Sequence, residues 1–162
     1  MRIALGTGVV VLVLDQVTKA IVERTMALNE SIPLLPFFSL TYVRNTGAAF
    51  GVLRELDAAL RLPLFVLVTL LAVGALVSYL RQLRPDESIV AAALGGILGG
   101  AAGNLICRLR YGEVVDFAHL HYRSFDWPMF NVADSAITVG VAIVLLHSLR
   151  ATPNRAPATE GR

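Results

Sequence analysis

Long apolar runs separated by polar segments form the main pattern of this chain. The pattern predicts transmembrane helices over about 3–22, 62–80, 88–108 and 132–149, each near the roughly 20 residues that cross a bilayer. The second run carries no charged residue, and the third carries none before its last position. Asp15 and Lys19 interrupt the first run, and Asp134 interrupts the fourth. We therefore expect an all-α membrane protein with one domain over 1–150.

The segments between the spans predict a small structured platform. Four spans leave both termini on one side and the loops 23–61 and 109–131 on the other. Basic residues are denser in the terminal and 81–88 segments, which favours cytoplasmic termini. Aromatic and β-branched residues predict strand structure over 37–43, and in the second loop they alternate with rings typical of the bilayer interface. We expect an extracytoplasmic β-platform, a turn over 44–47 and a short interfacial helix over 55–62. The tail over 151–162 is expected to be a disordered cytoplasmic segment.

Composition supports the membrane class and excludes others. The chain is 56% hydrophobic and 16% charged, whereas soluble domains carry about a quarter charged residues. A net charge of +2 without a basic stripe gives no indication of nucleic-acid binding. Cys107 is the only cysteine, so no internal disulfide can form. His119 and His121 share a strand face, but two ligands do not make a zinc site, so neither metal nor cofactor is expected.

Polar side chains inside the spans are costly and usually face a bundle interior. Asp15 and Lys19 lie four residues apart on one helix face, either as a neutralising pair near the membrane surface or as part of a site. Asn104 and Arg108 have the same spacing, and Arg108 needs a partner from another segment. Five glycines of this third helix predict close helix packing: Gly95, Gly96, Gly99, Gly100 and Gly103.

Asp116 and Asp134 allow more than one interpretation. Asp116 suits a solvated loop charge, and Asp134 suits a capping box in which Asn131 is the N-cap. Both segments also meet at one membrane face, where two close carboxylates share a proton and support aspartic protease chemistry without a metal. A small transporter, with Asp134 or Arg108 on the substrate path, is a further alternative.

Five segments, in order, resemble the signatures of the lipoprotein signal peptidases, also called signal peptidase II. They are DQVTK at 15–19, NTGAAFG at 45–51, the glycine-rich run ending in Asn104 and Arg108 at 100–108, VVDF at 114–117, and FNVADS at 130–135. The resemblance covers most of 15–149.

This resemblance implies an aspartic endopeptidase of the bacterial inner membrane, with its active site near the outer face. Its partners would be membrane lipids and diacylglyceryl-modified prolipoproteins, from which it removes the signal peptide on the amino side of the lipid-modified cysteine. It would act as a monomer, with Asp116 and Asp134 as the catalytic dyad. Matching positions also imply binding or supporting residues: Asp15, Lys19, Asn45, Gly47, Asn104, Arg108, Asn131 and Ala133.

One position departs from the family pattern. The family commonly has an aspartate directly before the arginine of the third signature, and this chain has Cys107 there. The position either shapes the site or packs the third helix. An inactive paralogue that binds lipopeptides is therefore an alternative to a working enzyme.

Overall fold

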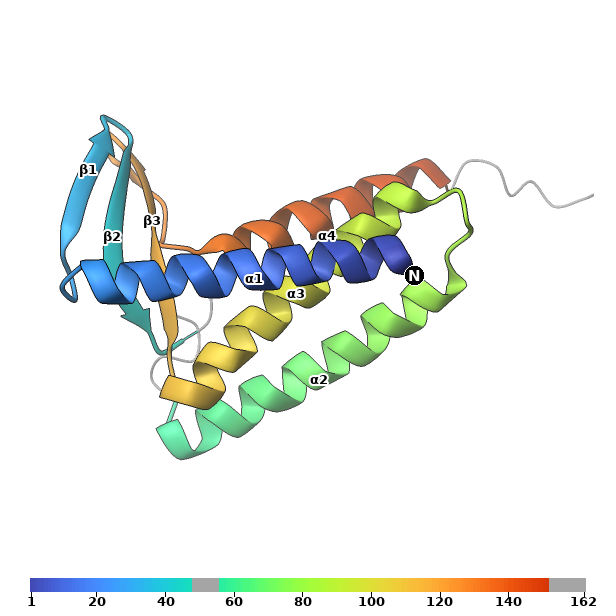
Figure 1. Ribbon diagram of the computed structural model, residues 1–162, viewed down its shortest axis with the longest axis horizontal. Coiled ribbons are helices and arrows are strands. Elements are labelled where there is room, and N and C mark those ends of the chain that lie inside the picture. The colour runs from blue at the N-terminus through green and yellow to red at the C-terminus, as the bar shows by residue number, and fades with distance from the viewer. Residues whose placement is uncertain (48–55, 152–162) are drawn as a thin grey trace, which may run out of the picture.

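The chain folds into a helix bundle with a small sheet across one end (Figure 1). The computed structural model describes residues 1–47 and 56–151. Its helices are α1 (Arg2–Thr25), α2 (Ala58–Gln82), α3 (Ser88–Tyr111) and α4 (Val132–Ala151). All four are long and apolar enough to cross a membrane. The four predicted spans are therefore confirmed, with helix ends that extend by up to four residues.

Close backbone contacts place α3 at the centre of the bundle. It packs against the other three helices, and the stripe of small residues faces α1 and α4. A Cβ added at Gly99 would collide with the backbone of Gly8, and one at Gly100 would lie 2.6 Å from the Ala133 carbonyl oxygen. The packing role predicted for the glycine face is thus confirmed at these positions.

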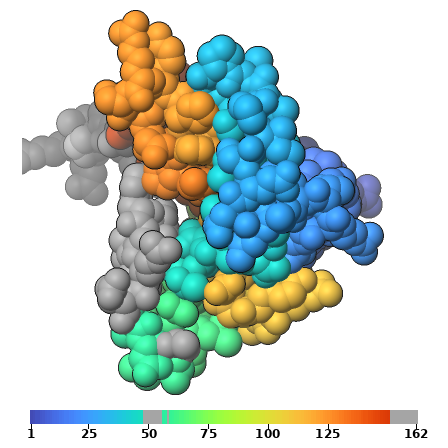
Figure 2. Space-filling model, turned by 90° about the vertical axis from the view of Figure 1, so that its left-hand side faces the viewer, coloured from blue at the N-terminus to red at the C-terminus, as the bar shows by residue number. Residues whose placement is uncertain are grey.

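The sheet is antiparallel in the order β1 (Ser31–Leu35), β2 (Phe38–Asn45), β3 (Val114–Tyr122) and β4 (Phe125–Asp126). Figure 2 views this end and shows the strands side by side, next to the start of α2 and the end of α3. Val22 of α1 and Met26, which directly follows this helix, pack with Tyr42 and Val115 in an apolar cluster that holds the sheet against the bundle. Gly112 ends α3 with a φ of 74° and turns the chain into β3.

Some details differ from the sequence predictions. β2 continues through Arg44 and Asn45, so the turn begins later than 44. The separate short helix expected over 55–62 is wrong from residue 58 onward, because this segment is the first turn of α2 and the helix continues past Pro63. Residues 48–55 lie outside the described part of the chain, as does the tail from 152 onward. The first residue of that predicted tail, 151, ends α4.

Candidate active site

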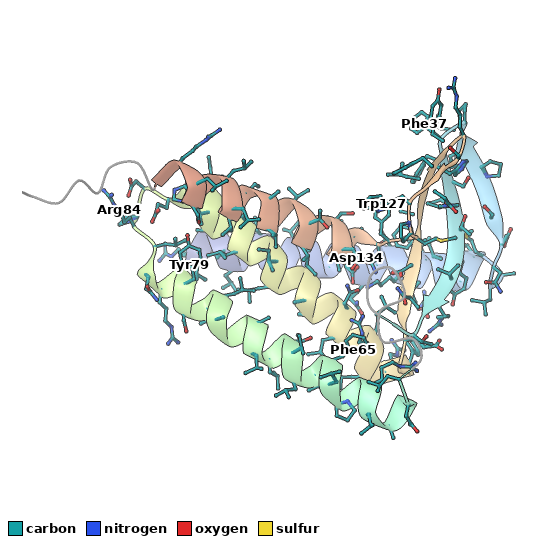
Figure 3. The ribbon with its side chains drawn as sticks, turned by 180° about the vertical axis from the view of Figure 1, so that it is seen from behind. Phe37, Phe65, Tyr79, Arg84, Trp127 and Asp134 are labelled. Atoms are coloured by element: carbon teal, nitrogen blue, oxygen red, sulfur yellow. The ribbon has the colours of Figure 1, made fainter. Side chains whose placement is uncertain are left out.

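Two carboxylates line one cavity where the sheet meets the helices. Asp116 is the third residue of β3, and Asp134 lies in the first turn of α4. Both contribute to the lining of a cavity of about 750 Å³. Figure 3 shows Asp134 at the end of α4 next to the sheet. The fold therefore places two acidic residues, 18 positions apart in the sequence, on the wall of one cavity.

Asp116 is buried and held by two amides. Asn45 donates from Nδ2 to Asp116 Oδ2 at 2.9 Å, and Asn131 donates from Nδ2 to Oδ1 at 2.6 Å. Burial, reinforced by the nearby charge of Asp134, raises the pKa of Asp116 to about 7, although both amides oppose the shift. Asp116 can therefore hold or release a proton near neutral pH.

Asp134 occupies a capping box. Its backbone N–H donates to Asn131 Oδ1 at 2.9 Å, and its Oδ2 accepts from the Asn131 backbone N–H at 3.2 Å. Its Oδ1 accepts from Asn104 Nδ2 at 2.8 Å. The predicted cap is confirmed, and it leaves the carboxylate on the cavity wall. Helix-terminal N–H groups and the Asn104 amide both favour the charged form of this side chain.

A buried chain of polar groups links α1 to this pair. Lys19 Nζ lies 2.8 Å from Asp15 Oδ2 and donates to Asn104 Oδ1 at 2.8 Å. Asp15 Oδ1 accepts from the backbone N–H of Ala133 at 3.0 Å. Asp15 and Lys19 are buried and form an ion pair, so they neutralise each other, and their contacts to Asn104 and Ala133 also link the pair to the site. The contact from Lys19 fixes the orientation of the amide that reaches Asp134.

Arg108 lies on the cavity wall beside α2. Its guanidinium carbon is 4.1 Å from the centre of the Phe65 ring, and its Nη2 donates to the Gly47 carbonyl at 3.2 Å. Gly47 in turn donates its N–H to Asn45 Oδ1 at 3.0 Å. The partners of Arg108 come from other segments, as predicted, but these two are a carbonyl and an aromatic ring rather than an acid.

Comparison with known proteins agrees with this arrangement. Residues 7–150 match the family model for signal peptidase (SPase) II. The chain belongs to the signal peptidase II family. It is 50% identical over 147 residues to a lipoprotein signal peptidase of Geobacter sulfurreducens, covering 90% of this chain and 91% of that one. It is 48% identical over 150 residues to the lipoprotein signal peptidase of Syntrophotalea carbinolica, covering 92% of each.

A solved bacterial membrane enzyme has the same fold. It is 32% identical to this chain and aligns with a TM-score of 0.86 over 100% of this chain and 96% of its own. Family and fold together confirm the prediction of a multi-pass membrane protease with four spanning helices and a small sheet.

The structure connects all ten of the residues expected at the site. Gly47 and Ala133 take part through backbone atoms rather than side chains. Sequence reasoning missed Phe65, which contacts Arg108, and it missed Pro128, Met129 and Thr138, which line the cavity. Thr138 follows Asp134 by one helical turn, and that spacing was the available signal. The role of Phe65 had no comparable signal, because it lies within a uniformly apolar run.

Cys107, the departure from the family pattern, faces α1. Its thiol is buried and lies 3.9 Å from Gln16 Nε2, and it is absent from the described cavity lining. Gln16 also donates to Asp15 Oδ2 at 3.0 Å and to the Gly103 carbonyl at 3.1 Å. The position therefore packs α3 against α1, and its change to cysteine leaves both cavity carboxylates intact.

Proposed function

We propose that this chain hydrolyses the peptide bond on the amino side of a diacylglyceryl-modified cysteine in prolipoproteins, with Asp116 and Asp134 as its catalytic residues. The supporting observation is that a buried carboxylate, Asp116, and a half-buried one, Asp134, line one cavity and that side-chain amides bind each of them. Relatives named lipoprotein signal peptidase, at 50% and 48% identity, support the substrate class.

The two carboxylates take opposite roles in this proposal. Asp134 is the base: burial opposes its charged form, and the Asn104 amide and the N-cap N–H donate to it and stabilise that form against this effect. Asp116, with a pKa near 7, carries the shared proton. Asp134 removes a proton from water as the oxygen attacks the scissile carbonyl, and Asp116 protonates the carbonyl oxygen. The tetrahedral intermediate then collapses: as the C–N bond breaks, Asp134 gives the proton it took from water to the leaving amine, and Asp116 takes back the proton from the hydroxyl formed at the carbonyl oxygen. The signal peptide leaves with a new carboxyl group, and both carboxyl groups return to their starting states.

The substrate explains why the site lies at the end of the bundle. Acyl chains hold the modified cysteine at the membrane, so its scissile bond lies near an interface. We propose that the sheet end faces outward from the inner membrane and that both termini are cytoplasmic, since α1 begins and α4 ends at the opposite end (Figure 1). We propose that the enzyme acts as a monomer in contact with membrane lipids.

A cleavage assay in detergent tests the proposal. Purified parent protein should convert a diacylglyceryl-modified prolipoprotein into a shorter lipoprotein and a free signal peptide. Asp116→Asn and Asp134→Asn should each lower turnover at least ~100-fold while the protein stays folded. Asp86→Asn, at an exposed acid, is the matched control. Turnover by either cavity variant at the parent rate would refute the dyad. A folded parent that binds the substrate without cleaving it would indicate an inactive paralogue.

A further inference from the structure

Thr138 lies on the cavity wall one helical turn beyond Asp134. Four residues of α-helix advance about 6 Å along the axis. Because α4 begins at the sheet, Thr138 lies about 6 Å further into the span than the proposed catalytic carboxylate. The residues around it on this wall, Ile137 and Val139, are apolar. The cavity therefore has a polar end at the two carboxylates, where the Ser135 hydroxyl donates to the Asn131 carbonyl, and an apolar part that contains the Thr138 hydroxyl.

The hydroxyl of Thr138 differs from most serine and threonine hydroxyls of the spans in its hydrogen bonding. Serine and threonine in helices commonly donate to the carbonyl four residues earlier. Thr7, Thr18 and Ser78 do so at 2.7–2.8 Å. Thr138 makes no such bond, and no other hydrogen bond to the described part of the chain involves it. Its donor is thus available to a molecule in the cavity.

We propose, on the basis of the function proposed above, that the Thr138 hydroxyl donates to an ester carbonyl of the diacylglyceryl group. In the substrate, the thioether and the first glyceryl carbon separate the esters from the cysteine backbone. With the scissile carbonyl at the carboxylates, the esters reach the depth of Thr138, and the acyl chains continue along Ile137 and Val139. Thr138 is then a specificity-determining residue that distinguishes a lipid-modified cysteine from a free one.

The test pairs enzyme variants with two substrates. Thr138→Val removes the hydroxyl and keeps the side-chain shape, whereas Thr138→Ser keeps the hydroxyl. Thr69→Val makes the same change in α2, away from the described cavity lining. Each variant is assayed for kcat/KM on a prolipoprotein with the diacylglyceryl (diester) group and on the same peptide with a dialkylglyceryl (diether) group, which lacks both carbonyls.

We expect Thr138→Val to lower kcat/KM about threefold to tenfold on the diester substrate and to leave the diether substrate unchanged. Thr138→Ser should restore diester cleavage, and Thr69→Val should match the parent on both. An equal loss on both substrates would overturn the inference, because the hydroxyl would then act on the protein or on bilayer lipid. No loss on either would also overturn it. In either of these two outcomes, the proposed function would stand if Asp116→Asn still abolished cleavage. A parent enzyme that cleaved neither substrate would overturn the proposed function and the Thr138 inference together.

Discussion

Replacing Lys19 with methionine tests whether the buried polar chain supports both the fold and the proposed catalytic pair, Asp116 and Asp134. Lys19 is the only lysine in the sequence. Its side chain is 3% exposed, and that of its partner Asp15 is 0% exposed. Methionine preserves the length of the side chain but leaves the Asp15 carboxylate without its cation. Removing one member of a buried ion pair costs about 3–5 kcal/mol, so we expect a comparable loss in the free energy of unfolding.

The same change should lower activity through Asn104. This amide accepts from Lys19 and donates to Asp134. Without Lys19 it loses the shorter of its two donors, at 2.8 Å, and retains Asn131 Nδ2 at 3.2 Å. A weaker hold on Asn104 weakens its bond to Asp134, which should reduce turnover roughly tenfold.

Thermal unfolding and cleavage, measured in one detergent, separate the two effects. Lys19→Met should unfold at least ~6 °C below the parent. Adding Asp15→Asn removes the unpaired charge, so the double variant should regain most of the lost stability while turnover stays low. Arg24→Met, at an exposed position of the same helix, controls for the loss of one positive charge. If Lys19→Met unfolded and cleaved like the parent, the buried chain would have neither role.

Two further changes test the site. Cleavage should fall as pH rises through about 7, where Asp116 loses its proton, and Asn45→Ala should move this fall to higher pH because Asn45 stabilises the charged form. Because folding raises the pKa of Asp116 from 3.8 to about 7, the contribution of protonated Asp116 to the free energy of unfolding should also decline as the pH rises from about 4 to 7. A cleavage rate that is flat across neutral pH would contradict the role of Asp116 as the proton donor. Gly103→Ala should lower stability by about 1–3 kcal/mol, because the added Cβ collides with the Asp15 carboxylate. Gly96→Ala, in the same helix with open space around it, should unfold and cleave like the parent, and equal behaviour of the two variants would refute the collision.

The hydrophobic pattern predicted the spans because the second and third runs are nearly free of charge and the first and fourth are long enough once their few polar residues are allowed inside them. It could not predict β1, where Ser31 and Pro33 break any alternation and the strand exists because β2 pairs with it at the sheet edge. It also could not separate residues 58–62 from α2. Leu60 and its neighbours have helical spacing whether that helix ends at 62 or continues, and nothing in the run marks an end.

The candidate site was less accessible to spacing alone. Asn131 and Asp134 predict a cap from their separation, and the cap exists, but the same spacing does not reveal that the carboxylate lines a cavity. Family resemblance selected Asp116 and Asp134 together. Phe65 and Thr138 remained hidden because their roles depend on which helix faces meet, and the glycine contacts of α3 set that geometry.

The charges around the cavity give a physical reason for a shared proton. Asp15 and Lys19 cancel as a buried pair, and Arg108 adds one positive charge that contacts a carbonyl and a ring. Arg44, also on the wall, is paired with Glu23 at 2.6 Å. If Asp116 and Asp134 were both ionised, one surplus negative charge would therefore remain in a low-dielectric site, whereas one shared proton makes the cluster neutral. Amides can hold such a pair without adding charge, which is why asparagines rather than lysines or arginines contact both carboxylates.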